Sequence, residues 1–308
     1  MRTMTRSAVL AAVALTLAAC GGGGATVAPT VTGAPTAVVT TPPTATPDPC
    51  TAANLATLTA GTLTVGADNP AFPPYYEPTD PKPAGSIWED GDPTNGKGLE
   101  SATAYAIAEA LGYAETAVTW VAAPFNGAIQ PGPKTFDIYL TQVSYSAERA
   151  TATDLSDGYF DLNQAVVALG DNPIAKVTTE AGLAAFKLGA PVGTTSYQYI
   201  VDNIKPTQEA SVYDTLDAAV QALNAKQIDG IVVDLPTAFF MRSVQLTGGV
   251  IVGSLPTVGA VEHFSVLLTK GSPLTACVNG AIAAIKADGT LKAIVDEWIS
   301  GQGAPELK

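Results

Sequence analysis

The segment DIYLTQVSYSAERATATDLSDGYFD spans Asp137–Asp161. It begins with a short run typical of a buried strand, Asp137–Leu140, and continues into a polar stretch that contains a Glu-Arg pair. On both sides of this segment, short β-branched runs alternate with alanine-rich helical segments. The runs predicted as strands are Thr62–Gly66, Val118–Val121, Gln164–Leu169, Pro191–Gly193, Ile228–Val233 and Phe264–Leu268, and those predicted as helices are Ser101–Leu111, Leu183–Lys187, Thr215–Lys226, Leu274–Ala287 and Thr290–Ser300. This alternation predicts an α/β fold with mostly parallel sheets covered by helices, in which ligand sites lie outside the carboxyl ends of the strands.

The chain is acidic and lightly charged. It has 308 residues, 28 acidic and 15 basic side chains, and a formal net charge of −13. Its length allows one large or two medium domains, because domains commonly run ~100–200 residues. Binding to a nucleic-acid backbone is driven by clustered Lys and Arg, so this charge balance argues against DNA, RNA and other polyanions as partners.

The first twenty residues, MRTMTRSAVLAAVALTLAAC, have the pattern of a secretory signal, predicted over residues 1–19. The apolar run Ala8–Ala19 is too short to span ~30 Å of hydrocarbon as a stable anchor. Leu17–Cys20 also resembles the bacterial lipobox, in which the cysteine is diacylated and becomes the mature N-terminus. A chance cysteine after an ordinary signal is the alternative. Lipidation of Cys20 implies an exported protein anchored to the outer face of the bacterial plasma membrane.

Residues 20–50 are rich in Thr, Pro and Gly and predict a semi-flexible tether after the lipidated cysteine. No later run approaches ~18 apolar residues, so we do not expect the chain to re-enter the bilayer. Cys50 and Cys277 remain once Cys20 is assigned to lipid. An even pair in an exported protein favours a disulfide, with two buried thiols as the alternative.

The sequence carries no recognisable enzyme motif. His263 is the only histidine, and neither CxxC nor HExxH occurs, so we expect no metal and no cofactor. A Ser-His-Asp triad would have to use His263, which lies at the start of a predicted strand without a nucleophile-elbow sequence. The Gly21–Gly24 tract lacks the strand and the GK[ST] sequence that a phosphate loop requires.

Several stretches resemble, in order, the amino-acid-type (family 3) solute-binding proteins of ABC importers, which have the type II periplasmic binding protein fold. The resemblance covers about Leu58–Gly301 and is strongest in Asp137–Asp161, where these proteins carry a similar strand, a Ser/Thr pair and a Glu-Arg. The other stretches are TLTVGADNPAFPPYYE (Thr62–Glu77), SATAYAIAEALGY (Ser101–Tyr113), WVAAPFNGAI (Trp120–Ile129), PVGTTS (Pro191–Ser196), QIDGIVVDLP (Gln227–Pro236) and the ending KADGTLKAIVDEWIS.

The resemblance implies two α/β lobes, each a mixed, mostly parallel sheet flanked by helices, joined by two hinge strands, with the ligand in the cleft between them. The two crossings are expected near Asn163–Val167 and Val261–Val266. Lobe 1 would then comprise residues 51–164 plus 265–308, and lobe 2 residues 165–264. Both cysteines of the possible disulfide fall near or within lobe 1 on this division.

An amino acid held in a closed cleft needs a cation for its carboxylate and an anion for its ammonium, because unpaired buried charge is costly. Arg149 fits the first need, since a guanidinium forms two parallel bonds with a carboxylate. By position it matches the family's carboxylate-binding arginine, and Ser144 matches the Ser/Thr five residues earlier. Asp234 ends an apolar strand and matches the family's ammonium-binding aspartate. The alternatives are a surface Glu-Arg pair for Arg149 and a helix N-cap for Asp234.

One segment and three single residues are also expected to contact the ligand. Thr194-Thr195-Ser196 follows a predicted strand and matches the family's second carboxylate-binding segment, with a plain N-cap as the alternative. Phe72 and Phe125 match the aromatic positions around the ligand side chain, and core packing is their alternative. Asp68 matches a position that contacts the end of that side chain, with turn chemistry as its alternative.

Two departures from the family pattern concern specificity. Gln142 replaces a common glycine near the ligand, so its side chain should narrow the pocket or provide its own hydrogen bond. The Asp80–Lys97 segment lengthens the first connection and is expected to form a rim over the cleft.

The resemblance therefore implies a monomeric, non-enzymatic solute receptor that delivers an amino acid to an ABC permease. The alternatives are a dehydratase on the same fold, with Glu77 or Glu100 as proton donor, and a ligand-sensing surface lipoprotein.

Overall fold

The computed structural model describes residues 48–299 and 303–308. The predicted signal peptide, Cys20 and nearly all of the tether lie outside these residues. The described strands form two five-stranded sheets, in the orders β2-β1-β3-β10-β4 and β7-β6-β8-β5-β9. The first sheet comprises β1 (Leu63–Ala67), β2 (Val118–Ala122), β3 (Ile138–Tyr139), β4 (Thr153–Leu162) and β10 (Glu262–Thr269). The second comprises β5 (Gln164–Leu169), β6 (Leu188–Pro191), β7 (Ser211–Tyr213), β8 (Gly230–Asp234) and β9 (Gly249–Ser254).

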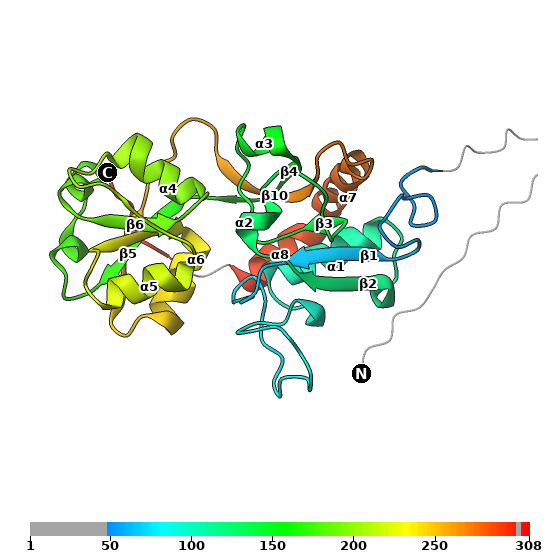
Figure 1. Ribbon diagram of the computed structural model, residues 1–308, viewed down its shortest axis with the longest axis horizontal. Helices are drawn as coiled ribbons and strands as arrows, with labels where there is room; N and C mark the ends of the chain where they lie inside the picture. The colour runs from blue at the N-terminus through cyan, green and yellow to red at the C-terminus, as the bar shows by residue number, and fades with distance from the viewer. Residues whose placement is uncertain (1–47, 300–302) are drawn as a thin grey trace, which may run out of the picture. The chain divides into compact units, whose positions relative to one another are not determined.

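Helices flank each sheet, and each sheet with its helices makes one lobe (Figure 1). Lobe 1 carries α1 (Leu99–Ala110), α2 (Phe125–Ala128), α3 (Arg149–Ala152), α7 (Thr275–Ala287) and α8 (Thr290–Trp298). Lobe 2 carries α4 (Thr195–Tyr199), α5 (Leu216–Asn224) and α6 (Leu235–Phe240). Short 3-10 and π segments lie at Pro93–Asn95, Glu115–Ala117, Pro173–Lys176, Glu180–Ala185, Ile200–Ile204 and Met241–Gln245. None of the described helices has the length and apolar character needed to cross a bilayer.

Both sheets are mixed. β1 pairs in parallel with β2 and β3, while β10 runs antiparallel to β3 and β4. In the second sheet β6 pairs in parallel with β7 and β8, while β5 runs antiparallel to β8 and β9. Two sheets with helices on their faces confirm the predicted two-lobed α/β fold class.

The chain passes between the lobes through the ends of long strands. It leaves the first sheet at Leu162, the last residue of β4, and enters the second at Gln164, the first residue of β5. It returns between Ser254, where β9 ends, and Glu262, where β10 begins. The strands are hydrogen-bonded in their sheets up to the residues that cross between the lobes. The lobes are therefore joined by two short connections with few rotatable backbone bonds.

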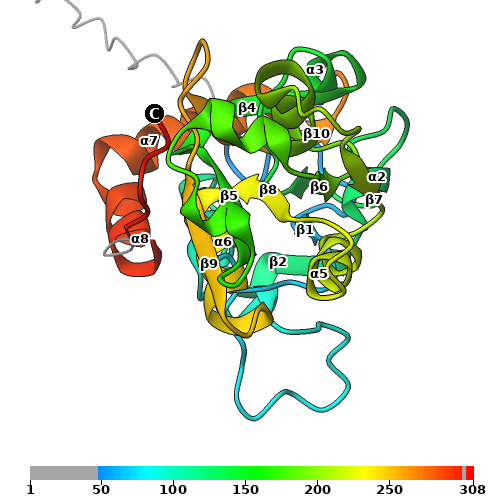
Figure 2. The ribbon, with the colours of Figure 1, turned by 90° about the vertical axis from the view of Figure 1, so that its left-hand side faces the viewer.

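The last residues of the chain bond to lobe 2. The Ser254 amide donates to the Pro305 carbonyl at 2.7 Å, and the Leu307 amide donates back to the Ser254 carbonyl at 2.9 Å. Leu307 is 4% exposed and packs over Gly253. Figure 2 shows this end of the chain, in red, next to β9. The sequence-based division put residues 265–308 in lobe 1, but residues 303–308 pair with lobe 2 because the edge of β9 offers backbone partners and a buried place for Leu307.

Two predicted elements differ locally. Leu183–Lys187, expected as a helix, falls mostly in a 3-10 segment, Glu180–Ala185. The strand expected at Pro191–Gly193 lies earlier, because β6 ends at Pro191, which has no amide to continue the ladder. Gly193 then turns the chain with a φ of +72°, a conformation that favours glycine.

A disulfide joins Cys50 to Cys277, with 5.2 Å between the two Cα atoms and 227 residues of sequence separation. It ties the segment before β1 to α7, where Cys277 is 7% exposed within the core of lobe 1. The structure thus contains the pairing that the cysteine count favoured.

Replacing both cysteines by serine should lower the free energy of unfolding by up to about 4–5 kcal/mol, because the disulfide restricts a long loop of the unfolded chain. Urea unfolding of the oxidised protein and of the Cys50→Ser/Cys277→Ser variant measures the difference. The reduced wild-type protein is the control and should match the variant. Equal midpoints and slopes for the oxidised protein and the variant would contradict this prediction.

Candidate functional site

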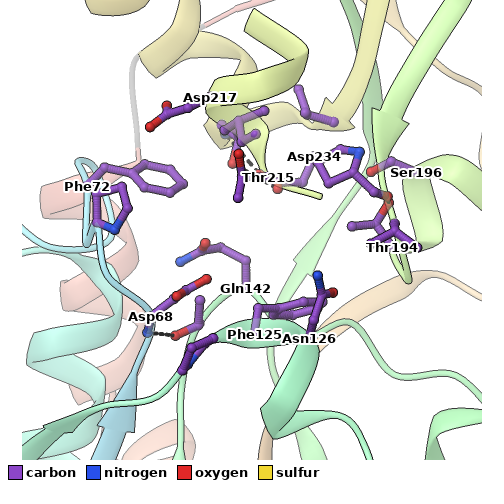
Figure 3. A pocket seen from close by; sticks show the side chains of 18 of the residues that line it. Asp68, Phe72, Phe125, Asn126, Gln142, Thr194, Ser196, Thr215, Asp217 and Asp234 are labelled. Atoms are coloured by element: carbon purple, nitrogen blue, oxygen red, sulfur yellow. Dashed lines mark hydrogen bonds between the residues drawn. The ribbon is translucent and has the colours of Figure 1, made fainter. Parts of the chain in front are cut away.

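The carboxyl ends of strands from both lobes surround one cavity of about 540 Å³ (Figure 3). Asp68 follows β1, Phe125 lies just after β2, and Asp234 is the last residue of β8. Parallel strands place such residues along one edge of each sheet, where α/β folds bind ligands. The volume is in the range of small-molecule sites, roughly 300–1,000 Å³.

All ten residues that the sequence assigned to a ligand line this cavity. They are Asp68, Phe72, Phe125, Gln142, Ser144, Arg149, Thr194, Thr195, Ser196 and Asp234. The fold therefore brings them together, while their roles toward a ligand stay predictions. Within the described residues, no group of three or more His, Cys, Asp or Glu side chains is placed to hold a metal ion.

Arg149, the first residue of α3, lies where the two lobes meet. Its side chain is buried, and one terminal nitrogen donates to the Gly193 carbonyl of lobe 2 at 2.9 Å. The other donates to the Ser144 carbonyl of lobe 1. The guanidinium carbon lies 5.4 Å from the centre of the Phe125 ring. Burial lowers the pKa of Arg149, yet a guanidinium with an ordinary pKa above about 12 stays charged at neutral pH.

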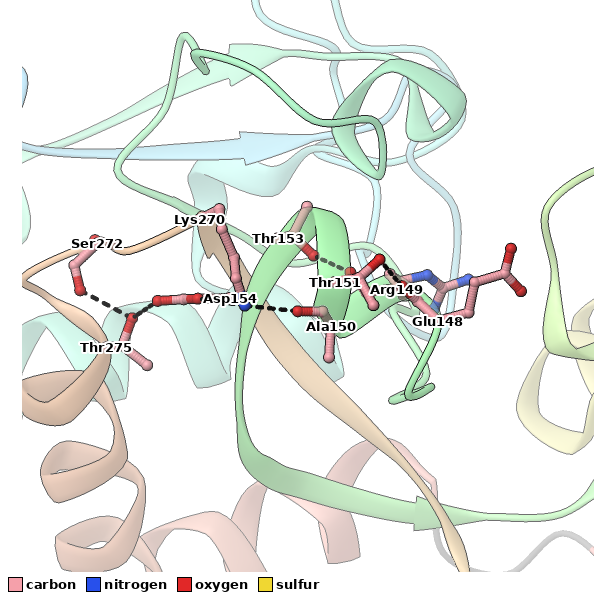
Figure 4. A network of polar contacts seen from close by, with 9 residues as sticks. All are labelled: Glu148, Arg149, Ala150, Thr151, Thr153, Asp154, Lys270, Ser272 and Thr275. Atoms are coloured by element: carbon pink, nitrogen blue, oxygen red, sulfur yellow. Dashed lines mark hydrogen bonds and ion pairs between the residues drawn. The ribbon is translucent and has the colours of Figure 1, made fainter.

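A polar network holds α3 against the rest of lobe 1 (Figure 4). Lys270 Nζ donates to the Ala150 carbonyl at 2.6 Å and lies 3.3 Å from Asp154 Oδ1. Thr275, at the start of α7, donates its hydroxyl to the other oxygen of Asp154 at 2.9 Å. Since α3 has a single turn, these bonds from outside the helix fix the position from which Arg149 reaches the cavity.

Asp234 is the last residue of β8 in lobe 2, and its side chain reaches lobe 1. It is the N-cap of α6, accepting the Thr237 amide and the Thr237 hydroxyl at 2.8 Å each. It also accepts the Tyr75 hydroxyl of lobe 1. Burial raises the pKa of Asp234. The N-cap alternative is therefore realised, and because a carboxylate has roughly four acceptor positions, three bonds leave room for one more donor.

The aromatic residues form walls of the cavity. The Phe72 ring is stacked on Phe240 of lobe 2, with centres 5.1 Å apart, and meets Tyr75 edge-on at 5.6 Å. The Phe125 ring lies against the Arg149 guanidinium. Both phenylalanines are half-buried, so each combines packing with a face open to the cavity.

The Thr194–Ser196 segment is tied to both interlobe strands. Ser196 donates to the side-chain oxygen of Gln164, the first residue of β5, at 2.7 Å. Thr195 donates to Glu262, the first residue of β10, at 2.5 Å, and Gln164 donates to the other oxygen of Glu262 at 2.9 Å. Thr194 is the N-cap of α4. The part of the cavity that this segment lines is thus bonded directly to the strands at both crossings between the lobes.

Gln142 lines the cavity and is bonded to Glu100, while its expected effect on a ligand stays a prediction. Its amide and its side-chain nitrogen donate to the two oxygens of Glu100, at 2.6 and 2.5 Å. Tyr159 donates to Glu100 at 2.5 Å. Glu100 is 0% exposed, and burial raises the pKa of its carboxyl to about 7. Gln142 has a φ of 43°, a backbone conformation that favours glycine.

The structure adds residues that the sequence reasoning missed. Further polar side chains line the cavity: Asn69, Asp90, Asn126, Thr141, Gln164, Asp214, Thr215, Asp217, Thr237 and Gln245. Asp214 and Asp217 flank Thr215, the N-cap of α5, directly after β7. The strand-end rule that located Asp234 would have found them, had β7 been recognised. Asp90 lies in the Asp80–Lys97 segment that was expected to form a rim.

Residues 63–301 match the model of the bacterial extracellular solute-binding proteins, family 3. The chain belongs to this family. This match confirms the resemblance seen in the sequence motifs. In the fold, these motifs lie at strand ends and helix starts around one cavity.

Three relatives show how wide the family is. The chain is 30% identical over 167 residues to the L-cystine-binding protein TcyJ of Escherichia coli (strain K12), a match that spans 54% of this chain and only 60% of that protein. It is 27% identical to an ancestral arginine-binding protein bound to glutamine, with a TM-score of 0.63 over 79% of this chain and 100% of that one. It is 26% identical to the ancestral amino acid-binding protein AncCDT-1, a precursor of cyclohexadienyl dehydratase, with a TM-score of 0.60 over 78% of this chain and 96% of that one. Family 3 thus includes binding proteins for amino acids.

The Glu100 carboxyl predicts a pH dependence of stability. Its pKa of about 7 in the folded protein exceeds its ordinary value of 4.5, so the folded state binds this proton more tightly than the unfolded state. The penalty for burying the charge is absent below pH 4.5 and complete above pH 7. Relative to Glu100→Gln, which does not titrate, the wild type should therefore lose about 3 kcal/mol of unfolding free energy from pH 4 to pH 8.

Urea unfolding at several pH values measures this difference. Glu115→Gln, at an exposed glutamate of the same lobe, is the matched control and should keep a constant offset from the wild type. Parallel pH profiles for the wild type and Glu100→Gln would show that the carboxyl titrates as in water.

Proposed function

We propose that this protein is a solute receptor that captures an amino acid, or a close analogue, in the cavity and delivers it to an ABC permease. One observation carries the proposal: a buried cation, Arg149, and a partly buried carboxylate, Asp234, line the same cavity from opposite lobes. A zwitterion presents one group to each. Family membership and relatives that are named for cystine and arginine support the choice of an amino acid.

Binding works through lobe closure. A ligand that touches Arg149 in lobe 1 and Asp234 in lobe 2 gains both contacts only when the lobes are together, so it shifts the population toward the closed state. Contacts between the lobes already exist at Tyr75 with Asp234 and at Phe72 with Phe240. The closed surface is then what the permease recognises.

The sequence and the family support a location outside the cell for this receptor. The family is one of extracellular solute-binding proteins. The signal-like start and the lipobox-like Leu17–Cys20, both outside the described residues, support lipid anchoring to the outer face of the plasma membrane. We propose a monomer, because one chain supplies both lobes and all the residues of the cavity.

The rival function is a dehydratase, and the ancestral neighbour AncCDT-1 gives it a basis. It needs a carboxylic acid that can reach the ligand. The two glutamates considered for that role, Glu77 and Glu100, are not among the residues that line the cavity, and Glu100 is bonded to Gln142 and Tyr159. This placement counts against these two glutamates as the proton donor.

A thermal-shift screen of the twenty amino acids should identify at least one that stabilises the protein. Calorimetry with that amino acid should then show that Arg149→Ala weakens binding by about 30-fold or more, because removing one partner of a buried charge pair leaves the other unpaired. Arg242→Ala is the matched control: Arg242 also lies 5.4 Å from a phenylalanine ring, that of Phe239, but outside the cavity. An Arg149→Ala affinity within threefold of the control would remove Arg149 from the site.

A further inference from the structure

The cavity carries a group of carboxylates at the end away from the Thr194–Ser196 segment. Asp68 projects from lobe 1 and Asp217 from lobe 2, and both lie on the side of Phe72 (Figure 3). Asp90 lines the same cavity. A backbone bridge between Asp90 and Ala71 fixes it beside the loop that carries Phe72.

These carboxylates have no basic partner among the described residues. The ion pairs of the described chain join Lys226 to Asp171, Lys270 to Asp154 and Lys292 to Asp296, all away from the cavity. Asp68 accepts the Asn69 amide at 2.8 Å, and Asp217 accepts the Gln245 side chain at 3.2 Å. Neutral donors of this kind leave the negative charge in place.

Closure brings like charges together. Asp217 belongs to lobe 2, whereas Asp90 and its neighbour Glu89 belong to lobe 1. Asp90 and Asp217 line the same cavity, and burial and then the negative charges of Asp90 and Glu89 raise the pKa of Asp217. Burial also raises the pKa of Asp68. Like charges that approach across the lobes oppose closure unless a cation lies between them.

The carboxylates are only part of the site. Arg149 is 8% exposed, and the guanidinium donates only to carbonyl oxygens. Its positive charge is therefore not neutralised, and the cavity favours a ligand with an anionic group next to Arg149. Asp234 has one acceptor position left for an ammonium group. A simple zwitterion satisfies these two residues and leaves Asp68, Asp90 and Asp217 without a positive partner.

We propose that the ligand carries a second positive charge on its side chain, and that Asp217 of lobe 2, opposite Asp68 and Asp90 of lobe 1, selects for it. The side chain runs between Phe72 and Phe125, and its cationic end lies among the three carboxylates. This inference rests on the proposed function and names the class of its ligand.

Asp217 also lies in the first turn of α5, where a carboxylate stabilises any helix. That role explains Asp217 alone and not the two carboxylates of lobe 1. It also has a different signature, because loss of helix stability would weaken every ligand equally, whereas loss of a cation partner weakens only cationic ones.

The test uses pairs of ligands that match in shape and differ in charge: arginine with citrulline, and lysine with norleucine. Calorimetry on the wild-type protein should show each cation binding at least about tenfold more tightly than its neutral partner. Asp217→Asn should weaken arginine several-fold and leave citrulline unchanged or tighter, since the repulsion on closure is relieved. Asp202→Asn, which removes the same charge from an exposed site of lobe 2 outside the cavity, should change neither.

Three results would overturn the inference. Citrulline or norleucine binding as tightly as its charged partner would show that the cavity does not select a cation, while leaving the proposed amino-acid function intact. Asp217→Asn weakening both members of a pair equally would reduce Asp217 to a structural role. If none of the twenty amino acids and neither neutral analogue binds, the proposed function itself fails.

Discussion

The rest of the site depends on one guanidinium buried where two lobes meet. Arg149 is held by carbonyl oxygens from both lobes, and its own lobe fixes it through the bonds of Lys270 and Asp154 around α3. Carbonyl dipoles reduce the cost of burying a charge but do not neutralise it. Because Gly193 belongs to the opposite lobe, bringing the lobes together and completing the surroundings of this cation are the same event.

Much of this could be predicted from the sequence, because the informative features are local. Alternating strand and helix patterns predicted the α/β fold class, and the resemblance to the family implied the two lobes and the place of Asp68. Asp234 ends an apolar strand, and Arg149 is a cation in a segment whose order of residues matched the family. In these cases a short stretch of sequence carried the signal. The cysteine count favoured the Cys50–Cys277 pair that the structure contains.

The remainder depends on contacts between residues far apart in the chain. Tyr75 and Asp234 are 159 positions apart, and neither has a neighbour that reveals the bond. The strand β4, TDLSDGYFDL, is rich in polar residues and glycine and is held by its long pairing with β10 rather than by propensity. The docking of Leu307 on lobe 2 depends on a free sheet edge that only the folded lobe creates. Asp90 and Asp217 line one cavity only because the two lobes lie together.

The net charge of −13 argues against polyanions as partners, but it does not identify the ligand. The ligand class depends on the arrangement of charged side chains inside the cavity. Contacts such as Phe72 with Phe240 and Tyr75 with Asp234 favour closed lobes whatever the ligand side chain is. Repulsion between Asp217 and the lobe 1 carboxylates opposes closure, and only a cation converts it into attraction. On the proposed function, affinity for the common part of an amino acid and selectivity for its side chain would therefore rest on different residues, so that one could change without the other.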